Sequence, residues 1–177
     1  EFKRSMEVPL GHPGAWTEPK ARWDITDLEV REGGPMVVVR NEDGASTLEV
    51  NEHEVELPTG IVSGLKISPD GKQLGFTLSR ADAPADAYTL EVKTLKLSRW
   101  TYSEAGGLDA MSFVKPERIT VKSFDGREVP AYLYRPSREG KVPVVVTIHG
   151  GPESQFRPSF SPQIQAWVNE LGVAVIA

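Results

Sequence analysis

The sequence contains no cysteine, only three histidines, and no apolar stretch long enough to span a bilayer. The absence of cysteine excludes disulfides, thiolate metal sites and a cysteine nucleophile. With no histidines at ligand spacing, we expect no metal and no cofactor. Glu1 to Leu10 lack the apolar segment of a signal peptide. These absences predict a cytoplasmic protein that has no membrane partner.

Positive charge is also scarce. The 177 residues carry a formal net charge of −5 at pH 7, and a nucleic-acid partner would require a basic face. Hydrophobic residues make up 39% and charged residues 25% of the chain, which is ordinary for a globular protein. The length suits one large domain or two smaller ones.

An internal repeat occupies the first part of the chain. Apolar residues alternate in Ile25–Val30 and again, at an offset of 37 residues, in Val62–Ile67. The four letters of Thr47–Val50 recur in Thr89–Val92, at an offset of 42 residues (47 to 89). The change from 37 to 42 indicates a five-residue insertion, which we expect to form a longer hairpin loop at Ser79–Asp86.

Each copy is predicted to form four short strands separated by turn residues. The expected strands are 24–31, 35–40, 46–50 and 54–57 in the first copy, and 62–68, 73–78, 87–92 and 95–102 in the second. Four strands in about 40 residues are typical of a β-propeller blade. The alternative is an antiparallel sandwich with a chance four-letter match. One offset for the first two strands, with a single insertion that explains the rest, favours two C-terminal propeller blades over 23–103. Residues 1–22 would be a lead segment or the remnant of a preceding blade.

A different pattern follows the predicted linker 104–117. We expect strands at 118–124, 129–134, 143–148 and 173–177, with the near-continuous apolar run 143–148 buried on both faces. Ser161 and Pro162 are typical of the start of a helix, and Gly172 of its end. The apolar face of this helix would consist of Ile164, Trp167, Val168 and Leu171. The order predicts the truncated start of an α/β-hydrolase domain at 118–177.

The motif His149-Gly150-Gly151-Pro152 lies between the apolar strand and the helix. In α/β-hydrolases, the loop at this place supplies one backbone N–H of the oxyanion hole. Such a donor stabilises the negative charge of a tetrahedral acyl-transfer intermediate. Glycines allow the backbone to approach a ligand closely and to adopt dihedral angles that other residues avoid.

The residues around this motif resemble the entry into the catalytic domain of the prolyl oligopeptidase family. The resemblance is carried by Phe113–Thr120, Ser123–Gly126, Ala131–Pro136 and the motif itself, whose histidine is similar to that of the acylaminoacyl-peptidase-like branch. It implies a β-propeller joined to an α/β-hydrolase domain. It also implies that Gly151 supplies the oxyanion N–H, that Gly150 belongs to the same loop, and that His149 shapes the loop.

His149 is not expected to be the triad base, because the triad of this fold runs Ser, Asp, His along the chain. The sequence contains no G-x-S-x-G motif. All three triad residues are therefore expected after Ala177, and the chain alone is expected to be inactive. We expect the final strand to be held by the remainder of the catalytic domain, supplied by the same protein or a second chain, or by other copies in a homo-oligomer.

Two charged residues after the motif have open roles. Glu153 and Arg157 would either form a rim that contacts a peptide substrate, or solvate the loop and form structural ion pairs. Solvation is favoured for Glu153, and the two roles are even for Arg157, because a guanidinium fork suits carboxylates.

The sequence thus predicts part of a serine peptidase that hydrolyses short peptides through an acyl-enzyme. One alternative is an esterase or lipase of the α/β-hydrolase fold, against which the repeat argues. Another is a non-catalytic propeller that binds a partner and carries a degenerate hydrolase segment.

Overall fold

The computed structural model describes residues 23–108, 110–151 and 153–177, so the predicted lead segment 1–22 lies outside the described residues. The first eight strands are β1 (Asp24–Val30), β2 (Met36–Glu42), β3 (Ala45–Val50), β4 (His53–Val55), β5 (Gly60–Ile67), β6 (Gln73–Arg80), β7 (Ala83–Glu91) and β8 (Lys96–Arg99). A short 3-10 turn (Ala110–Ser112) then precedes β9 (Glu117–Lys122), β10 (Glu128–Tyr134), β11 (Val144–Val146), α1 (Pro162–Asn169) and β12 (Ala174–Ile176).

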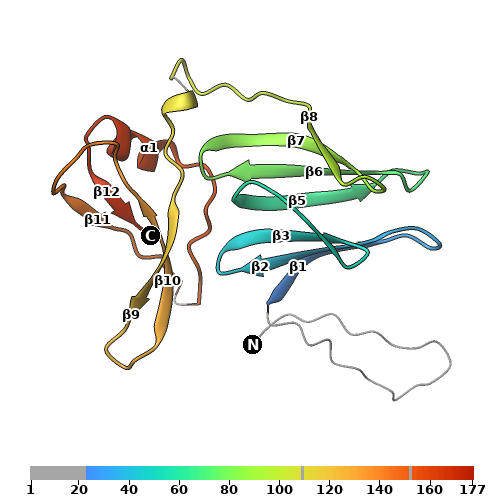
Figure 1. Cartoon of the computed structure of the whole chain (residues 1–177), viewed down its shortest axis with the longest axis horizontal. Coiled ribbons are helices and arrows are strands. Elements are labelled where there is room, and N and C mark those ends of the chain that lie inside the picture. The colour runs from blue at the N-terminus through green and yellow to red at the C-terminus, as the bar shows by residue number, and fades with distance from the viewer. Residues whose placement is uncertain (1–22, 109, 152) are drawn as a thin grey trace.

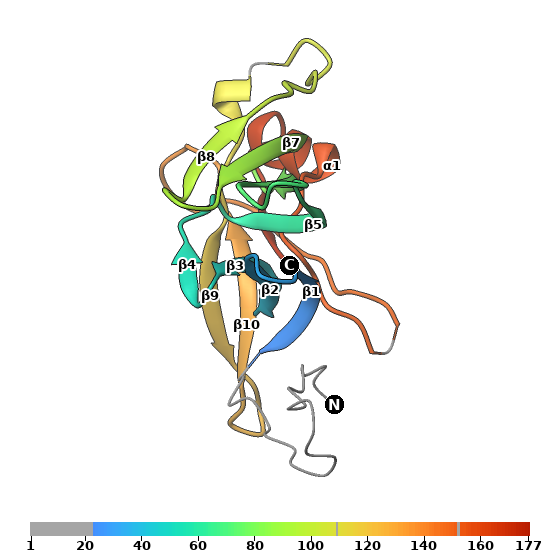
Figure 2. The same cartoon turned by 90° about the vertical axis from the view of Figure 1, so that its right-hand side faces the viewer.

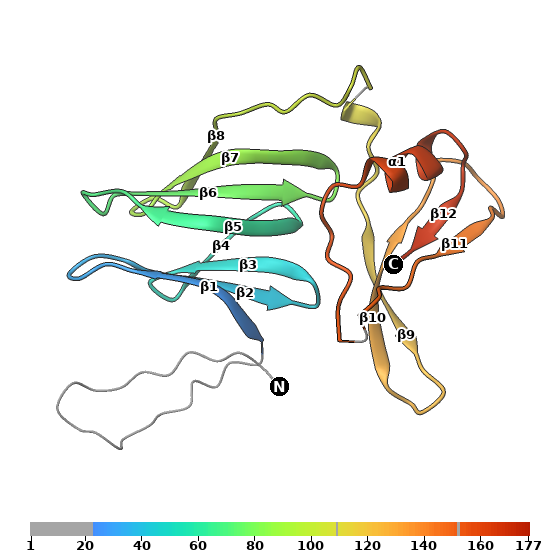
Figure 3. The same cartoon turned by 180° about the vertical axis from the view of Figure 1, so that it is seen from behind.

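The first eight strands form two antiparallel sheets of four strands each, in the orders β1-β2-β3-β4 and β5-β6-β7-β8. We call them the first and second meander sheets, and they lie one above the other in Figure 1 and Figure 3. One apolar core joins them. Its buried members from the two sheets are Val37, Val39, Leu48, Val50, Val55, Val62, Leu65, Leu74, Phe76, Leu78, Tyr88 and Leu90. Burial against this shared core explains why apolar residues alternate along β3 and β6.

The repeat predicted from the sequence corresponds to equivalent turns in the two sheets. The Gly34 N–H donates to the Arg31 carbonyl at 2.9 Å, and the Gly71 N–H donates to the Ser68 carbonyl at 2.9 Å. The two donors are 37 residues apart in the sequence, and so are the two acceptors. The matching four-letter segments begin within β3 and β7, which are the third strands of their sheets. The prediction of two four-stranded units is confirmed.

The predicted hairpin loop at Ser79–Asp86 is wrong. β6 extends to Arg80 and β7 begins at Ala83, so the extra residues lengthen two strands and leave a tight turn. The turn is stabilised by the Arg80 guanidinium, which donates to both carboxylate oxygens of Asp82 at 2.8 and 2.7 Å. Ala81 at the tip is only 2% exposed because the hairpin packs against a later part of the chain.

The third sheet, which we call the mixed sheet, has the order β11-β12-β10-β9. β11 and β12 are parallel, whereas β10 is antiparallel to both of its neighbours. α1 lies beside β12 (Figure 3), and a second core forms under it. This core contains Tyr132, Tyr134, Ile164, Val168 and Val175.

The prediction that the apolar run 143–148 is buried on both faces is wrong for the described structure, in which this run contains β11. Val144 and Val146 are 52% and 62% exposed. The described residues include one α-helix, α1, which lies on one face of the mixed sheet and, as Figure 2 shows, beside the second meander sheet. No described helix covers the exposed Val144 and Val146 side chains.

The helix begins where the sequence predicts, since the Ser161 hydroxyl accepts a hydrogen bond from the Ile164 N–H at 3.3 Å. Its end is earlier than expected. Leu171 lies beyond α1 and is 64% exposed, so its place in the predicted apolar face is wrong. α1 ends at Asn169, and the positive φ of Gly172 (+63°) turns the following chain away from the helical direction. No helix in the described residues is long and apolar enough to cross a membrane.

Candidate functional site

The candidate site is the loop that follows β11. Gly151 has a φ of +143°, a region that side chains disfavour. A Cβ atom at this position would lie 2.9 Å from the Glu153 nitrogen and 3.1 Å from the Ser154 Cβ, because the chain folds back there. Gly151 is exposed, and no described residue accepts a hydrogen bond from its N–H. The position therefore requires glycine and leaves a backbone donor available for a ligand.

The neighbouring motif residues are also exposed. The His149 Nδ1 lies 3.0 Å from the Gly150 carbonyl oxygen, so the ring can donate to the loop backbone in one tautomer. A Cβ atom added at Gly150 would have no heavy atom within 4 Å, so space alone does not require glycine there. Pro152 lies outside the described residues. The roles assigned to His149, Gly150 and Gly151 stay predictions.

Arg157 lies half-buried between the loop segment and the first meander sheet. Its Nε donates to the Gly44 carbonyl at 3.0 Å, and its Nη2 donates to the Ser46 hydroxyl at 3.2 Å. Burial lowers the pKa of Arg157 because desolvation disfavours the charged form. Glu153 is exposed and forms no ion pair within the described ranges. The substrate-binding role considered for both residues stays a prediction.

Further contacts join the β2–β3 turn to the later part of the chain. The Asn41 Nδ2 donates to the Gln155 Oε1 at 2.8 Å, and the Tyr132 hydroxyl donates to the Asp43 carbonyl at 3.1 Å. Arg118 forms an ion pair with Asp43. Burial raises the pKa of Tyr132. Sequence reasoning missed this junction, because no local pattern marks contacts between residues that are 75 to 114 positions apart.

The second meander sheet makes a similar contact through Gln165, which is only 2% exposed. Its amide nitrogen donates to the Val114 carbonyl at 3.0 Å and to the Ala81 carbonyl at 3.3 Å. Its amide oxygen accepts from the Val114 N–H at 2.8 Å. Gln165 therefore joins α1, the connecting segment and the β6–β7 turn.

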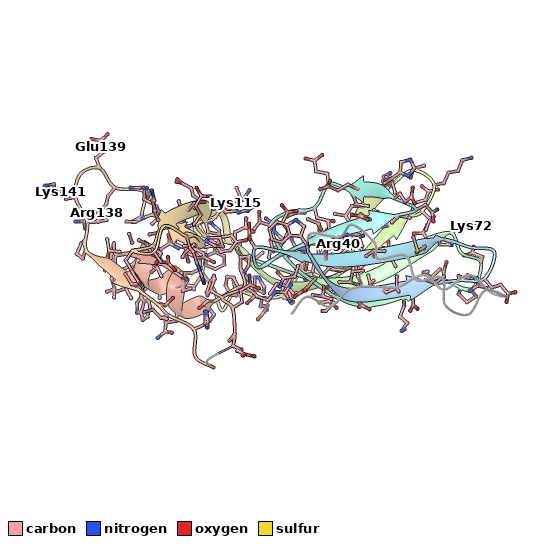
Figure 4. All side chains as sticks on the ribbon, turned by 90° about the horizontal axis from the view of Figure 1, so that it is seen from below. Arg40, Lys72, Lys115, Arg138, Glu139 and Lys141 are labelled. Carbon is pink, nitrogen blue, oxygen red and sulfur yellow. The ribbon has the colours of Figure 1, made fainter. Side chains whose placement is uncertain are left out.

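The charged ends of the molecule are well separated. Figure 4 shows Lys115 where the mixed sheet meets the meander sheets, and its Nζ lies 3.8 Å from an Asp82 carboxylate oxygen. Arg138, Glu139 and Lys141 lie at one far end of the molecule, and Lys72 lies near the other.

No group of three or more potential metal ligands occurs within the described ranges.

A mostly apolar cavity of about 540 Å³ opens beside the loop. Among its lining residues are Val129, Val146, Ile148, His149 and Phe156. Of the described motif residues, His149 lines this cavity and Gly150 and Gly151 do not. The start of the motif loop thus borders an apolar surface that includes the exposed Val146 side chain of β11.

Neither a family model nor a curated protein sequence matches the chain. Solved structures do match. A prolyl endopeptidase has a TM-score of 0.75 and 21% identity, and a puromycin-hydrolysing peptidase from Mycobacterium tuberculosis has a TM-score of 0.75 and 19% identity. These matches cover 98% and 93% of this chain. The chain has the fold of these peptidases.

A third similar structure is the acylaminoacyl peptidase of Pyrococcus horikoshii, with a TM-score of 0.64, 20% identity and 87% of this chain covered. The resemblance to the prolyl oligopeptidase family is thus confirmed at the level of the fold. The chain spans only about a quarter of the matched structures, namely 27%, 28% and 24% of their lengths.

Proposed function

We propose that the chain is part of a serine peptidase that hydrolyses short peptides. In this proposal, the meander sheets are two propeller blades, and residues 118–177 begin an α/β-hydrolase domain. The observation that carries it is Gly151, which combines an available N–H with a backbone that requires glycine, on a loop whose His149 lines an apolar cavity. The shared fold of peptidases across this whole stretch supports the same function.

The Gly151 N–H would stabilise the oxyanion that forms when a serine attacks a peptide carbonyl. His149 would hold the loop by donating to the Gly150 carbonyl. The serine, aspartate and histidine of the triad would lie outside these 177 residues, because the sequence contains no G-x-S-x-G motif. The peptide substrate and the remainder of the catalytic domain would be the partners of the chain.

The test uses a full-length protein that contains this chain. We expect a fluorophosphonate probe to label it at one serine, and we expect aminoacyl anilides and short peptides to be hydrolysed. Gly151→Ala keeps the backbone N–H but should displace it, because alanine disfavours a φ of +143° and its Cβ atom would lie 2.9 Å from the Glu153 nitrogen. We expect kcat to fall by up to the roughly 100- to 1,000-fold that the loss of one oxyanion donor costs. Gly140→Ala is the matched control, since Gly140 has a similar need for positive φ (+87°) and no atom within 4 Å of an added Cβ.

The outcomes separate the alternatives. Robust ester turnover without peptide or anilide turnover would identify an esterase. Peptide binding without labelling or turnover would identify a non-catalytic binding module. Either result would overturn the peptidase proposal.

A further inference from the structure

The segment between the motif and α1 has no regular secondary structure, so contacts elsewhere must determine its path. Residues 153–161 contain no helix or strand. The first meander sheet provides much of the support. Gln155 accepts from Asn41, and Arg157 donates to Gly44 and Ser46. These hydrogen bonds connect residues more than 110 positions apart.

The β2–β3 turn also approaches the segment at van der Waals distance. Gly44 has a φ of +96°, and a Cβ atom there would lie 2.7 Å from the Phe156 carbonyl oxygen. The Phe156 ring packs against Tyr132 with 6.0 Å between the ring centroids. The backbone of the segment is therefore fixed between the turn on one side and the mixed sheet on the other.

The acceptor used by Arg157 is itself held in place. The Ser46 hydroxyl accepts from the Val62 N–H of β5 at 3.0 Å, and Ser46 is 9% exposed. Ser46 thus connects both meander sheets to Arg157. A guanidinium fixed through two of its nitrogens to a rigid double sheet can determine the position of the chain that carries it.

We propose that Arg157 is a positioning residue for the oxyanion loop, through which the meander sheets determine where the Gly151 N–H lies. This inference rests on the proposed function. Arg157 follows Gly151 by only six residues in the sequence, and Gln155 and Phe156 between them are held by the same junction. A displacement of about 1 Å at a catalytic group can cost about 100-fold in rate.

The kinetic test compares Arg157→Ala, Arg157→Lys and Arg40→Ala in the full-length protein. Arg40 is the matched control, because it belongs to the first meander sheet and, among the described residues, its guanidinium hydrogen-bonds only to Glu49, at 3.1 and 3.2 Å. Arg157→Ala should lower kcat by roughly 10- to 100-fold with KM nearly unchanged. Arg157→Lys should recover part of the loss, and Arg40→Ala should leave kcat near that of the parent.

A boronic acid transition-state analogue gives a readout that a general loss of stability would not produce. Its affinity should fall in Arg157→Ala by the same factor as kcat/KM, because the defect lies in oxyanion stabilisation. An unchanged kcat, or a rise in KM alone, would overturn the inference. The second result would assign Arg157 to substrate binding instead.

Hydrogen exchange tests the anchoring without reference to activity. Amides of residues 153–157 should exchange faster in Arg157→Ala than in Arg40→Ala, and equal exchange would overturn the inference. Gly44→Ala should have the same effect by pushing on the Phe156 carbonyl, whereas Gly126→Ala, with a φ of +85° and open space, should not. If the full-length protein shows neither labelling nor turnover, the proposed function fails while hydrogen exchange still decides the anchoring.

Discussion

Replacing Gln165 with leucine should weaken the whole junction between the second meander sheet and α1. The substitution keeps a side chain of similar size but removes an amide that is 2% exposed. Four hydrogen bonds are lost: two with Val114, one with the Ala81 carbonyl, and one from the Asn169 side chain at 3.1 Å. The Val114 N–H and the carbonyls of Val114 and Ala81 would lose these partners in a partly or fully buried setting.

The expected cost follows from the number and quality of these bonds. A neutral hydrogen bond contributes about 1 kcal/mol net, and a buried group left without a partner costs about 1 to 3 kcal/mol. The bond to Ala81 is long at 3.3 Å, and Asn169 is exposed and can turn to water. We therefore expect Gln165→Leu to lower the free energy of unfolding by about 3 kcal/mol.

Urea unfolding followed by tryptophan fluorescence measures this change, since Trp167 lies in the same helix. Gln163→Leu is the matched control, because Gln163 is an exposed glutamine of α1 and its replacement should change stability by less than about 0.5 kcal/mol. A loss below about 1 kcal/mol for Gln165→Leu would refute the reasoning. Gln165→Glu should be less destabilising at pH 4 than at pH 7, because only the protonated carboxyl can donate to a carbonyl.

Three further substitutions test other features. Tyr134→Phe should leave urea stability unchanged or raise it by up to about 1 kcal/mol, because the Tyr134 hydroxyl is buried without a hydrogen-bond partner in the described structure; a loss above 1 kcal/mol would reveal a missing partner. Burial raises the pKa of Asp86, but hydrogen bonds from Thr101, Ser103 and Arg99 outweigh it and lower the pKa overall. Asp86 should thus stabilise the protein above about pH 4, and this stabilisation should disappear as the pH falls through the lowered pKa; Asp86→Asn should cost more stability at pH 7 than at pH 2.5, and an equal cost at both would contradict the sign. Ser161→Ala should lower the free energy of unfolding by about 1 kcal/mol through loss of the helix cap, with no effect from Ser154→Ala as control.

Local rules predicted the elements that depend on neighbours in sequence. The alternation of apolar residues in 62–67 follows from the core shared by the two meander sheets. In 25–30 the same alternation predicted a strand, although Leu28 and Val30 are 42% and 62% exposed. The cap at Ser161 needs only the next turn of helix. The motif at His149 could be recognised because it lies between an apolar strand and a capped helix.

The sequence could not show which parts of the chain meet. The lengthened hairpin was mistaken for a loop because Ser79–Asp86 is polar and contains proline. Its strands continue because the turn is stabilised by the Arg80–Asp82 pair and by the hydrogen bonds of Ala81 with Thr59 and Gln165. Gln165 is a polar residue of α1, so the spacing of apolar residues along the helix does not predict that it is buried. For Arg157, residue type suggested a carboxylate partner, whereas the structure pairs it with a neutral carbonyl and a hydroxyl.

The turns of the two meander sheets lie at opposite ends of these sheets, and in the described structure one of these ends contacts the later part of the chain. The β2–β3 and β6–β7 turns meet Arg157 and Gln165, whereas the β5–β6 turn lies away from the junction, where Lys72 marks it in Figure 4. The far end is therefore the place for an affinity tag or a fluorophore. A label introduced beside Lys72 should leave the loop at His149–Gly151 undisturbed. One additional residue in the β6–β7 turn should break the hydrogen bond between the Ala81 carbonyl and Gln165 of α1.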